Sequence, residues 1–188
     1  MNITSLIHRR RSIFPKTYIQ GKPVDKSIIE QLLENANMAP SHRLTEPWRF
    51  QVFHSEESRM ALGQMLMDFY KKNTLPESFS EEKMLKMAEN PQRAGAVIAI
   101  IIKRDPEERI PEWEEVASVS MAVQNMWLTC TELGLGCYWS TPRAALEASE
   151  FLGLESGERS LGLFYLGWHE MPEIAGKRGP VAEKVVWR

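Results

Sequence analysis

The chain has 188 residues, of which 43% are hydrophobic and 26% charged, and its formal net charge at pH 7 is −2. These proportions are ordinary for a globular protein, whereas a dedicated nucleic-acid-binding protein is normally strongly basic. The apolar run over residues 94–102 is about half as long as a membrane span requires. We therefore expect one domain over residues 1–188, with neither nucleic acid nor a membrane as a partner.

The N-terminal residues lack the apolar core of a secretory signal, which predicts a cytoplasmic protein. The two cysteines, Cys130 and Cys137, are too few for a disulfide framework and lack the spacing of metal ligands. The four histidines are scattered, with no His-x-x-x-His pair, so no metal site is expected.

Apolar periodicity and turn residues divide the chain into helices and strands. In the N-terminal half we expect a helix over 2–10, a helix from about 25 to before Pro40, a strand over 49–54 and a Met-rich helix starting at Ser55. A loop over 75–80, a helix over 81–90 and a strand over 94–103 follow. The C-terminal half should contain a helix over 112–133, a strand over 137–140, a helix over 142–153 and a strand over 161–168. Helices outnumber strands and the two do not alternate regularly. The predicted fold class is therefore α+β, with a mixed central sheet flanked by helices.

Two of these segments should be buried on most sides. The run over 94–103 is continuous and rich in β-branched residues, which is typical of a strand covered on both faces. The helix over 112–133 is apolar around most of its circumference, which places it either at the centre of the molecule or in an oligomer interface. The tail over 176–188 is basic and then apolar, so we expect it to dock on another surface.

Residues suited to capping mark several predicted helix ends. Asp25 and Thr141 precede helical segments and are expected to be N-caps, while Gly134 is expected to be a C-cap. Pro142 would then occupy the first helical position after Thr141.

Several common catalytic frameworks are absent from the sequence. The stretch Gly134-Leu135-Gly136 follows a helix and lacks the third glycine of a Rossmann cradle. No P-loop and no Gly-x-Ser-x-Gly elbow occurs. The adjacent acids Glu81-Glu82 and Glu114-Glu115 point to different sides of their helices, which makes them poor acid–base pairs. A chain without such side-chain machinery suits an enzyme whose cofactor carries the chemistry.

One polar cluster is informative in its context. Arg9-Arg10-Arg11-Ser12 ends the first predicted helix, and guanidinium and hydroxyl groups are those that bind a phosphate ester. Alone, the cluster would also fit a solvated surface. It is followed by Ala39-Pro40-Ser41-His42 and Pro47-Trp48-Arg49-Phe50, and then by the long helix running into Gly134.

In this order the motifs resemble the FMN-dependent nitroreductase family, and the resemblance covers nearly the whole chain. It implies a nitroreductase-like fold and an intertwined homodimer, with FMN at the interface and residues of both chains in each active site. It also implies an enzyme that accepts hydride from NAD(P)H. The electrons would pass, by a ping-pong cycle, to a small electron-poor acceptor such as a nitroaromatic or a quinone.

The resemblance carries FMN-binding roles to specific positions. On one chain these are Arg10, Arg11 and Ser12 near the phosphate, the ribityl chain and the ring oxygens, Trp139, Ser140 and Thr141 beside the ring, and Lys177 and Arg178 in the tail. On the partner chain they are Met38, Ser41 and His42. Trp48 is a further candidate wall for the ring, with ordinary core packing as the alternative.

The chain departs from the commoner family pattern at two positions. Leu44 and Glu46 stand where that pattern has Asn and Gln, so substrate preference does not carry over with the fold. Two other functional classes stay open. One is a flavin-binding relative with another role, such as dehalogenation, flavin breakdown or sensing. The other is a non-enzymatic module that uses Arg9–Arg11 as a basic patch for nucleic acid.

Overall fold

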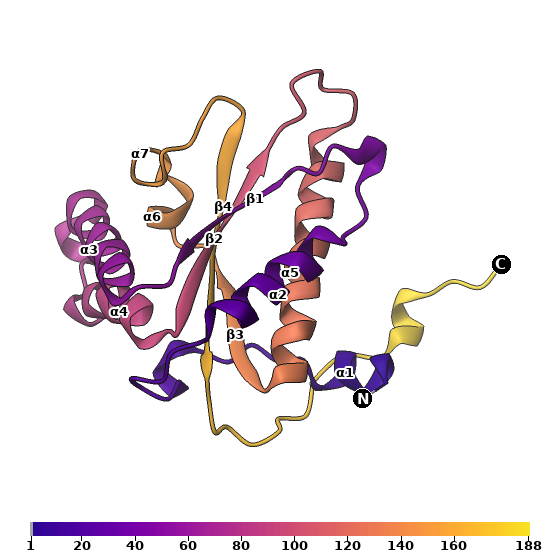
Figure 1. The fold of residues 1–188 in the computed structure, drawn as a ribbon, viewed down its shortest axis with the longest axis horizontal. Helices are drawn as coiled ribbons and strands as arrows, with labels where there is room; N and C mark the ends of the chain where they lie inside the picture. Colours follow the sequence, from indigo (N-terminus) through magenta and orange to yellow (C-terminus); the bar gives the residue numbers. More distant parts are fainter. Residues whose placement is uncertain (1) are drawn as a thin grey trace.

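The computed structural model describes residues 2–188 and contains one four-stranded sheet with helices on both faces (Figure 1). The strand order is β1-β2-β4-β3. The strands are β1 (Trp48–Phe53), β2 (Ala96–Lys103), β3 (Leu135–Ser140) and β4 (Glu158–Trp168). The α+β class is confirmed, and β3 lies at an edge of the sheet, which leaves one side of it open to other parts of the chain.

Each of the three strand pairings within residues 2–188 is antiparallel, so the expectation of a mixed sheet was wrong. The continuous apolar run of β2 suggested a strand covered on both faces, as parallel strands usually are. That burial is real, because residues alternating along β2 enter two different cores. The apolar pattern of a strand indicates which of its residues are buried, but it does not indicate whether the neighbouring strands are parallel or antiparallel.

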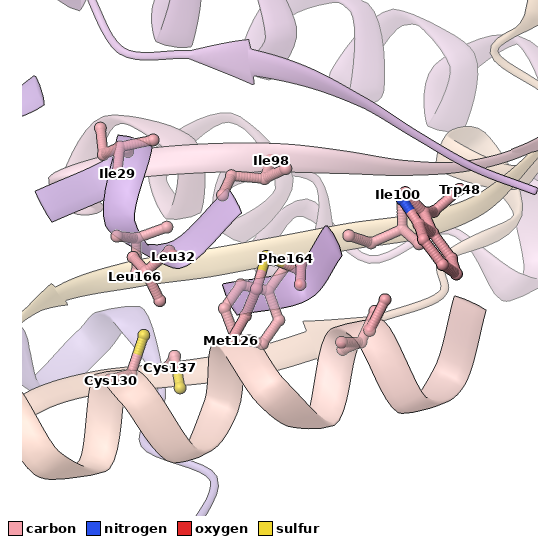
Figure 2. Packing of buried hydrophobic residues seen from close by; sticks show 14 of the residues in the cluster. Ile29, Leu32, Trp48, Ile98, Ile100, Met126, Cys130, Cys137, Phe164 and Leu166 are labelled. Atoms are coloured by element: carbon pink, nitrogen blue, oxygen red, sulfur yellow. The ribbon is translucent and has the colours of Figure 1, made fainter. Parts of the chain in front are cut away.

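The first core lies between the sheet and two helices, α2 (Lys26–Asn37) and α5 (Glu112–Leu133). Figure 2 shows Ile98 and Phe164 of the sheet packed toward Met126 of α5. Trp48 belongs to the same core, and its indole nitrogen donates to Asn37 Oδ1 at 2.9 Å. Core packing is therefore the role of Trp48, and the alternative of a cofactor wall does not hold within this chain.

The second core lies on the opposite face, under α3 (Glu56–Asn73), α4 (Glu81–Arg93), α6 (Arg143–Leu146) and α7 (Ser149–Leu152). Leu62 and Leu66 of α3 are fully buried there, at the helical spacing that the sequence shows. The short α1 (Ile3–Arg9) instead lies against α5, beside the C-terminal segment (Figure 1).

Three predicted helix boundaries differ from the observed ones. The helix expected to end at Asn90 continues to Arg93, because Pro91 is accommodated in its last turn. The helix expected over 142–153 is broken into α6 and α7 around Glu147. Pro142, not Thr141, is the N-cap of α6. Asp25 is the N-cap of α2 as expected, although its side chain accepts no capping hydrogen bond.

Two glycines are required by the backbone around β3. Gly134 ends α5 in the left-handed conformation, with φ of 75°, which favours glycine. Gly162 of β4 follows a bulge, and a Cβ there would lie 2.4 Å from Ser140 O. The indole nitrogen of Trp139 donates to Leu161 O at 2.9 Å across this bulge. The end of β3 is therefore held closely against β4.

The C-terminal tail, residues 175–188, extends away from the sheet (Figure 1). It contains one short turn, Val181–Lys184, and its apolar side chains are exposed, with Trp187 at 92%. Across residues 2–188, no helix combines the length and apolar character that a membrane crossing needs.

Candidate functional site

The segment Arg10–Phe14 runs along the open edge of β3. The Ile13 amide donates to Cys137 O at 3.0 Å, and the Trp127 indole of α5 donates to Arg11 O at 3.0 Å. These two bonds fix the backbone of the arginine cluster between an edge strand and the long helix. A segment of this length in extended form spans roughly 13 Å.

One end of this segment lines a cavity of about 1000 Å³, which we call the guanidinium cavity. Three arginines and three other polar side chains contribute to its wall; they are Arg10, Arg11, Arg178, His8, Ser12 and Gln124. No Asp or Glu is among its lining residues within the described chain. The volume is within the range of small-molecule and cofactor sites, and the charge suits an anion.

The electrostatics of Arg10 support an anion site. Its guanidinium lies over the Trp127 ring, 4.9 Å from the centroid, and has no ion-pair partner among residues 2–188. Burial, followed by the charges of Arg178 and Arg11, lowers the pKa of Arg10. Three like charges gathered without a carboxylate repel one another, and a bound phosphate would relieve that repulsion.

Arg11 has a different role from Arg10. Its Nε donates to Ile174 O at 2.7 Å, and its Nη1 donates to Arg10 O at 2.5 Å. The tail crosses directly over it, because a Cβ on Gly176 would lie 2.5 Å from Arg11 Nη2. Arg11 therefore anchors the tail that brings Arg178 into the cavity.

The two tail residues singled out in the sequence are not equivalent. Arg178 lines the guanidinium cavity, whereas Lys177 is exposed and outside its wall. Arg178 Nη1 donates to Lys177 O at 2.7 Å. Of the two, Arg178 is the one that the structure brings to Arg10.

A second cavity of about 380 Å³ lies at the other end of the segment, and we call it the aromatic cavity. Its floor is formed by Phe14 and by Tyr138 of β3, with ring centroids 4.9 Å apart. The rest of its wall comes from the turn after Phe14 and from α4; these residues are Pro15, Lys16, Lys86, Glu89, Asn90 and Arg93. This cavity was not predicted from the sequence, where its local signal was Phe14, an aromatic residue two positions after Ser12.

The residues expected beside the flavin ring, Trp139–Thr141, lie at the C-terminal end of strand β3. Trp139 is half-buried and packs against the first core, while Ser140 is half-buried and Thr141 exposed. None of the three lines the guanidinium cavity. They follow Tyr138 directly, but none of them lines the aromatic cavity, and Trp139 packs on the opposite face of the sheet from Tyr138.

The residues expected from the partner chain lie elsewhere on this chain. Met38 is 72% exposed and lines a separate hollow with α1 and α5 residues such as Leu128. His42 Nδ1 lies 2.5 Å from Glu114 Oε2, at the start of α5. About 20 Å of helix separates Glu114 from Trp127 at 1.5 Å per residue. One chain therefore does not bring His42 to the arginine cluster.

The loop that holds Ser41 and His42 is strained. Arg43, Leu44 and Glu46 all have positive φ, at 55°, 53° and 43°, a region that costs energy for residues other than glycine. Ser41 Oγ accepts a hydrogen bond from the Glu46 amide at 2.8 Å, which closes the loop. Strain of this kind persists where the surroundings enforce it, and it is concentrated at functional sites.

Two of the other histidines, His54 and His169, make local contacts. His54 Nε2 lies 2.8 Å from Val24 O, and the Met171 amide donates to His169 Nδ1 at 3.1 Å. Burial lowers the pKa of His169. Within residues 2–188 there is no group of three or more His, Cys, Asp or Glu side chains arranged to hold a metal ion.

Comparison with known proteins agrees with this architecture. The model of the nitroreductase family matches residues 7–168. A Bacillus subtilis (strain 168) protein named "Putative NAD(P)H nitroreductase YfhC" is 30% identical over 185 residues, covering 97% of this chain and 92% of the relative. The chain therefore belongs to the nitroreductase family.

Solved structures show the same fold. The nitroreductase-like family protein from Bacillus cereus superposes with a TM-score of 0.79 at 26% identity, covering 100% of this chain and 96% of that one. A Desulfovibrio desulfuricans protein described as "a putative nitroreductase in complex with fmn" gives a TM-score of 0.75 at 22% identity, with 100% and 98% covered.

Proposed function

We propose that this protein is a cytoplasmic FMN-dependent oxidoreductase that uses NAD(P)H to reduce small electron-poor acceptors such as nitroaromatics and quinones. The observation that carries the proposal is the guanidinium cavity, in which Arg10 and Arg178 converge without a carboxylate partner among the lining residues. Membership of the nitroreductase family and the printed name of the B. subtilis relative support the reaction class.

The residues present fit an FMN phosphate. A phosphate monoester carries nearly two negative charges and three acceptor oxygens, which would neutralise the repulsion between Arg10 and Arg178. Ser12 supplies a hydroxyl at the exposed wall of the same cavity. No dinucleotide-binding glycine motif accompanies these residues, which favours FMN over FAD.

The ring is expected beside the end of β3. Trp139, Ser140 and Thr141 would flank it, with the Trp139 side chain fixed by its hydrogen bond to Leu161 O. A side chain locked in this way holds its position during turnover. Lys177, next to Arg178 in the exposed tail, would contribute positive charge from the solvent side.

Bound FMN would supply the two-electron chemistry that no side chain here provides. The protein's own residues would bind and orient the cofactor and leave one face of it open. The nicotinamide donor and the acceptor would use that opening in turn, which is a ping-pong order. The arginine cluster would also stabilise the negative charge that accumulates on reduction.

We further propose that the functional unit is a homodimer with shared sites. His42 lies at Glu114, far along α5 from the arginine cluster of its own chain, and Met38 lines a separate hollow. With Ser41 of the same loop, these residues would reach the cluster of a second copy. The apolar residues exposed along α5, Trp113 at 69% and Met121 at 39%, support an interface on that helix.

The test is the colour of the purified protein. We expect a yellow protein whose flavin, released by heat and separated by chromatography, is FMN. Stopped-flow mixing with NADH or NADPH should bleach the flavin, and a quinone or nitroaromatic should restore its colour. Released FAD, or failure to bind flavin even after reconstitution, would refute the proposal, and bound FMN that no nicotinamide bleaches would favour a flavin-binding relative with another role.

A further inference from the structure

Trp127 of α5 connects the arginine segment to the core of the molecule. Its indole nitrogen donates to Arg11 O at 3.0 Å, and the Arg10 guanidinium lies over its ring, 4.9 Å from the centroid. The same ring meets Phe164 of β4 edge-on, with centroids 5.7 Å apart and an interplanar angle of 80°. One side chain therefore contacts both arginines and the sheet.

These contacts make Trp127 a fixed support. Phe164 is fully buried in the first core, so the indole that packs against it cannot shift without disturbing close-packed neighbours. Trp127 itself is half-buried and lines the guanidinium cavity. Its side chain is thus anchored on the core side and forms part of the cavity wall.

The two arginines that Trp127 contacts differ in their freedom. The Arg11 guanidinium is held by the backbone, because it donates to Ile174 O and to Arg10 O. The Arg10 guanidinium makes no hydrogen bond or ion pair among residues 2–188, so its stacking on Trp127 is what holds it at the cavity. An arginine without such a contact samples many rotamers, and ordering them on binding costs free energy.

We propose that Trp127 is a positioning residue, which orders the Arg10 guanidinium at the guanidinium cavity before a ligand binds and so favours FMN over the unphosphorylated flavin, riboflavin. Its ring face orders the charged group of Arg10, and its N–H fixes the backbone at Arg11. This inference rests on the proposed function and adds to it a residue that acts on the cofactor through another.

Packing alone is the competing role for Trp127. The side chain fills space beside Phe164, so its replacement lowers stability whether or not it positions Arg10. Riboflavin shares the ring and the ribityl chain of FMN but lacks the phosphate. A packing defect would therefore weaken the binding of both flavins by a similar factor, whereas a misplaced Arg10 would weaken the binding of FMN alone.

The test measures dissociation constants of FMN and riboflavin by fluorescence titration of the full-length apoprotein. Trp127→Leu should weaken FMN binding about two- to tenfold, which is the range for ordering one rotamer-rich side chain, and should leave riboflavin binding nearly unchanged. Trp127→Phe keeps an aromatic face but loses the N–H, so its effect on FMN should be smaller.

A double-mutant cycle provides a second measurement that needs FMN alone. If Trp127 acts through Arg10, Trp127→Leu should have little further effect on the FMN dissociation constant once Arg10→Ala is present. Two independent contributions would instead multiply, and the double variant would show the product of the two single losses.

Trp168 provides a matched control. Its indole nitrogen also donates to a backbone carbonyl, Pro23 O at 2.9 Å, and Lys22 lies over its ring, 4.7 Å from the centroid. Neither Trp168 nor Lys22 lines the guanidinium cavity. Trp168→Leu should therefore leave the ratio of the two flavin dissociation constants at its wild-type value.

The outcomes separate the positioning role from the proposed function. A wild-type protein that binds FMN, with a Trp127→Leu variant that loses affinity for both flavins equally or for neither, would overturn the positioning role and leave the proposed function intact. A full further loss in the Arg10→Ala background would overturn it as well. A wild-type protein that binds no flavin would overturn both.

Discussion

Arg10 is the residue on which cofactor binding should depend most directly. Its guanidinium is held over Trp127 and has no ion-pair partner among residues 2–188. Arg10→Ala should therefore weaken FMN binding without loss of fold. A hydrogen bond to a charged group contributes about 1.5–3 kcal/mol, or roughly tenfold to over a hundredfold in affinity. A flavin-fluorescence titration of the apoprotein measures the dissociation constant.

Arg9 provides the matched control for that experiment. It forms an ion pair with Glu173 and lines a smaller, separate hollow. Because its partner is an exposed surface carboxylate, Arg9→Ala should leave the FMN dissociation constant nearly unchanged. An equal loss in both variants would indicate a general effect of positive charge, and no loss in Arg10→Ala would make Arg10 a bystander.

Asp105 should make the free energy of unfolding depend on pH in the acid range. Its carboxylate accepts hydrogen bonds from the Arg109 amide and side chain, at 3.1 and 2.7 Å. The Arg109 side chain is the main cause that lowers the pKa of Asp105 to about 2. Since the folded pKa lies below the ordinary value of 3.8, this stabilisation is present above pH 4 and is lost as the pH falls toward 2.

The measurement is urea unfolding of wild type and Asp105→Asn at a series of pH values. At pH 6 the variant should unfold at lower urea, and the two midpoints should converge as the pH approaches 2. Glu77→Gln, at an exposed position in the Pro76–Ser78 turn, should show no such convergence. A difference between wild type and Asp105→Asn that is constant from pH 6 to pH 2 would contradict the assignment.

At the scale of elements, α5 has one buried and one exposed side. Val119, Val123 and Met126 are buried against the sheet, whereas Trp113 and Met121 are exposed. In Figure 1 the side of α5 turned away from the sheet has only short segments of this chain near it. An exposed apolar stripe on the longest helix is expected to be covered by a partner.

A charge placed in this stripe should therefore dissociate the proposed dimer. Met121→Glu should shift the sedimentation coefficient in analytical ultracentrifugation from dimer to monomer and lower flavin content. Met60→Glu is the control, because Met60 is 51% exposed on α3, on the other face of the sheet. A wild-type protein that is a folded, flavin-bound monomer throughout a dilution series would refute the interface.

The elements show which features a sequence determines locally. The end of α5 was predicted because Gly134 terminates the helix in the left-handed conformation. The start of α3 was predicted because Ser55 is its N-cap, whose side chain accepts a hydrogen bond from the Ser58 amide. The break between α6 and α7 and the direction of the strands depend on packing between distant segments. Apolar periodicity contains neither kind of information.

The candidate site likewise contains some residues that the sequence could indicate and others that it could not. Arg10–Ser12 could be chosen from the sequence because the proposed phosphate-binding cluster is contiguous. The aromatic cavity could not, since it needs Phe14 beside Tyr138 and the turn of Lys16 beside α4. Such contacts join segments far apart in the chain, and they become visible only in the folded structure.

At the scale of the whole molecule, the candidate residues fall into two groups. Arg10, Ser12 and Arg178 gather at one cavity, while Met38 and His42 lie toward other parts of the surface. If His42 serves the same flavin as Arg10, the two must come from different chains, because about 20 Å of α5 separates their neighbours Glu114 and Trp127. A dimer would then contain two sites, each built from the arginine group of one chain and the Met38–His42 loop of the other.

Complementation between inactive variants tests this arrangement. One variant carries Arg10→Glu and the other carries Met38→Ala with His42→Ala; each is expected to be inactive as a homodimer. In a heterodimer with shared sites, one site receives both lesions and the other receives neither. Refolding the two variants together should therefore restore part of the NAD(P)H-dependent reductase activity, up to one intact site for each heterodimer.

The alternative arrangement predicts a different result from the same mixture. If each chain supplied its whole site, every site in a heterodimer would keep one lesion and no activity would return. Each variant refolded alone is the control for spontaneous recovery, and mass spectrometry of differently tagged chains verifies that heterodimers have formed. Because an intact site in the heterodimer should also bind FMN, flavin content should rise together with activity. Verified heterodimers without either gain would show that the Met38–His42 loop does not complete the partner's site.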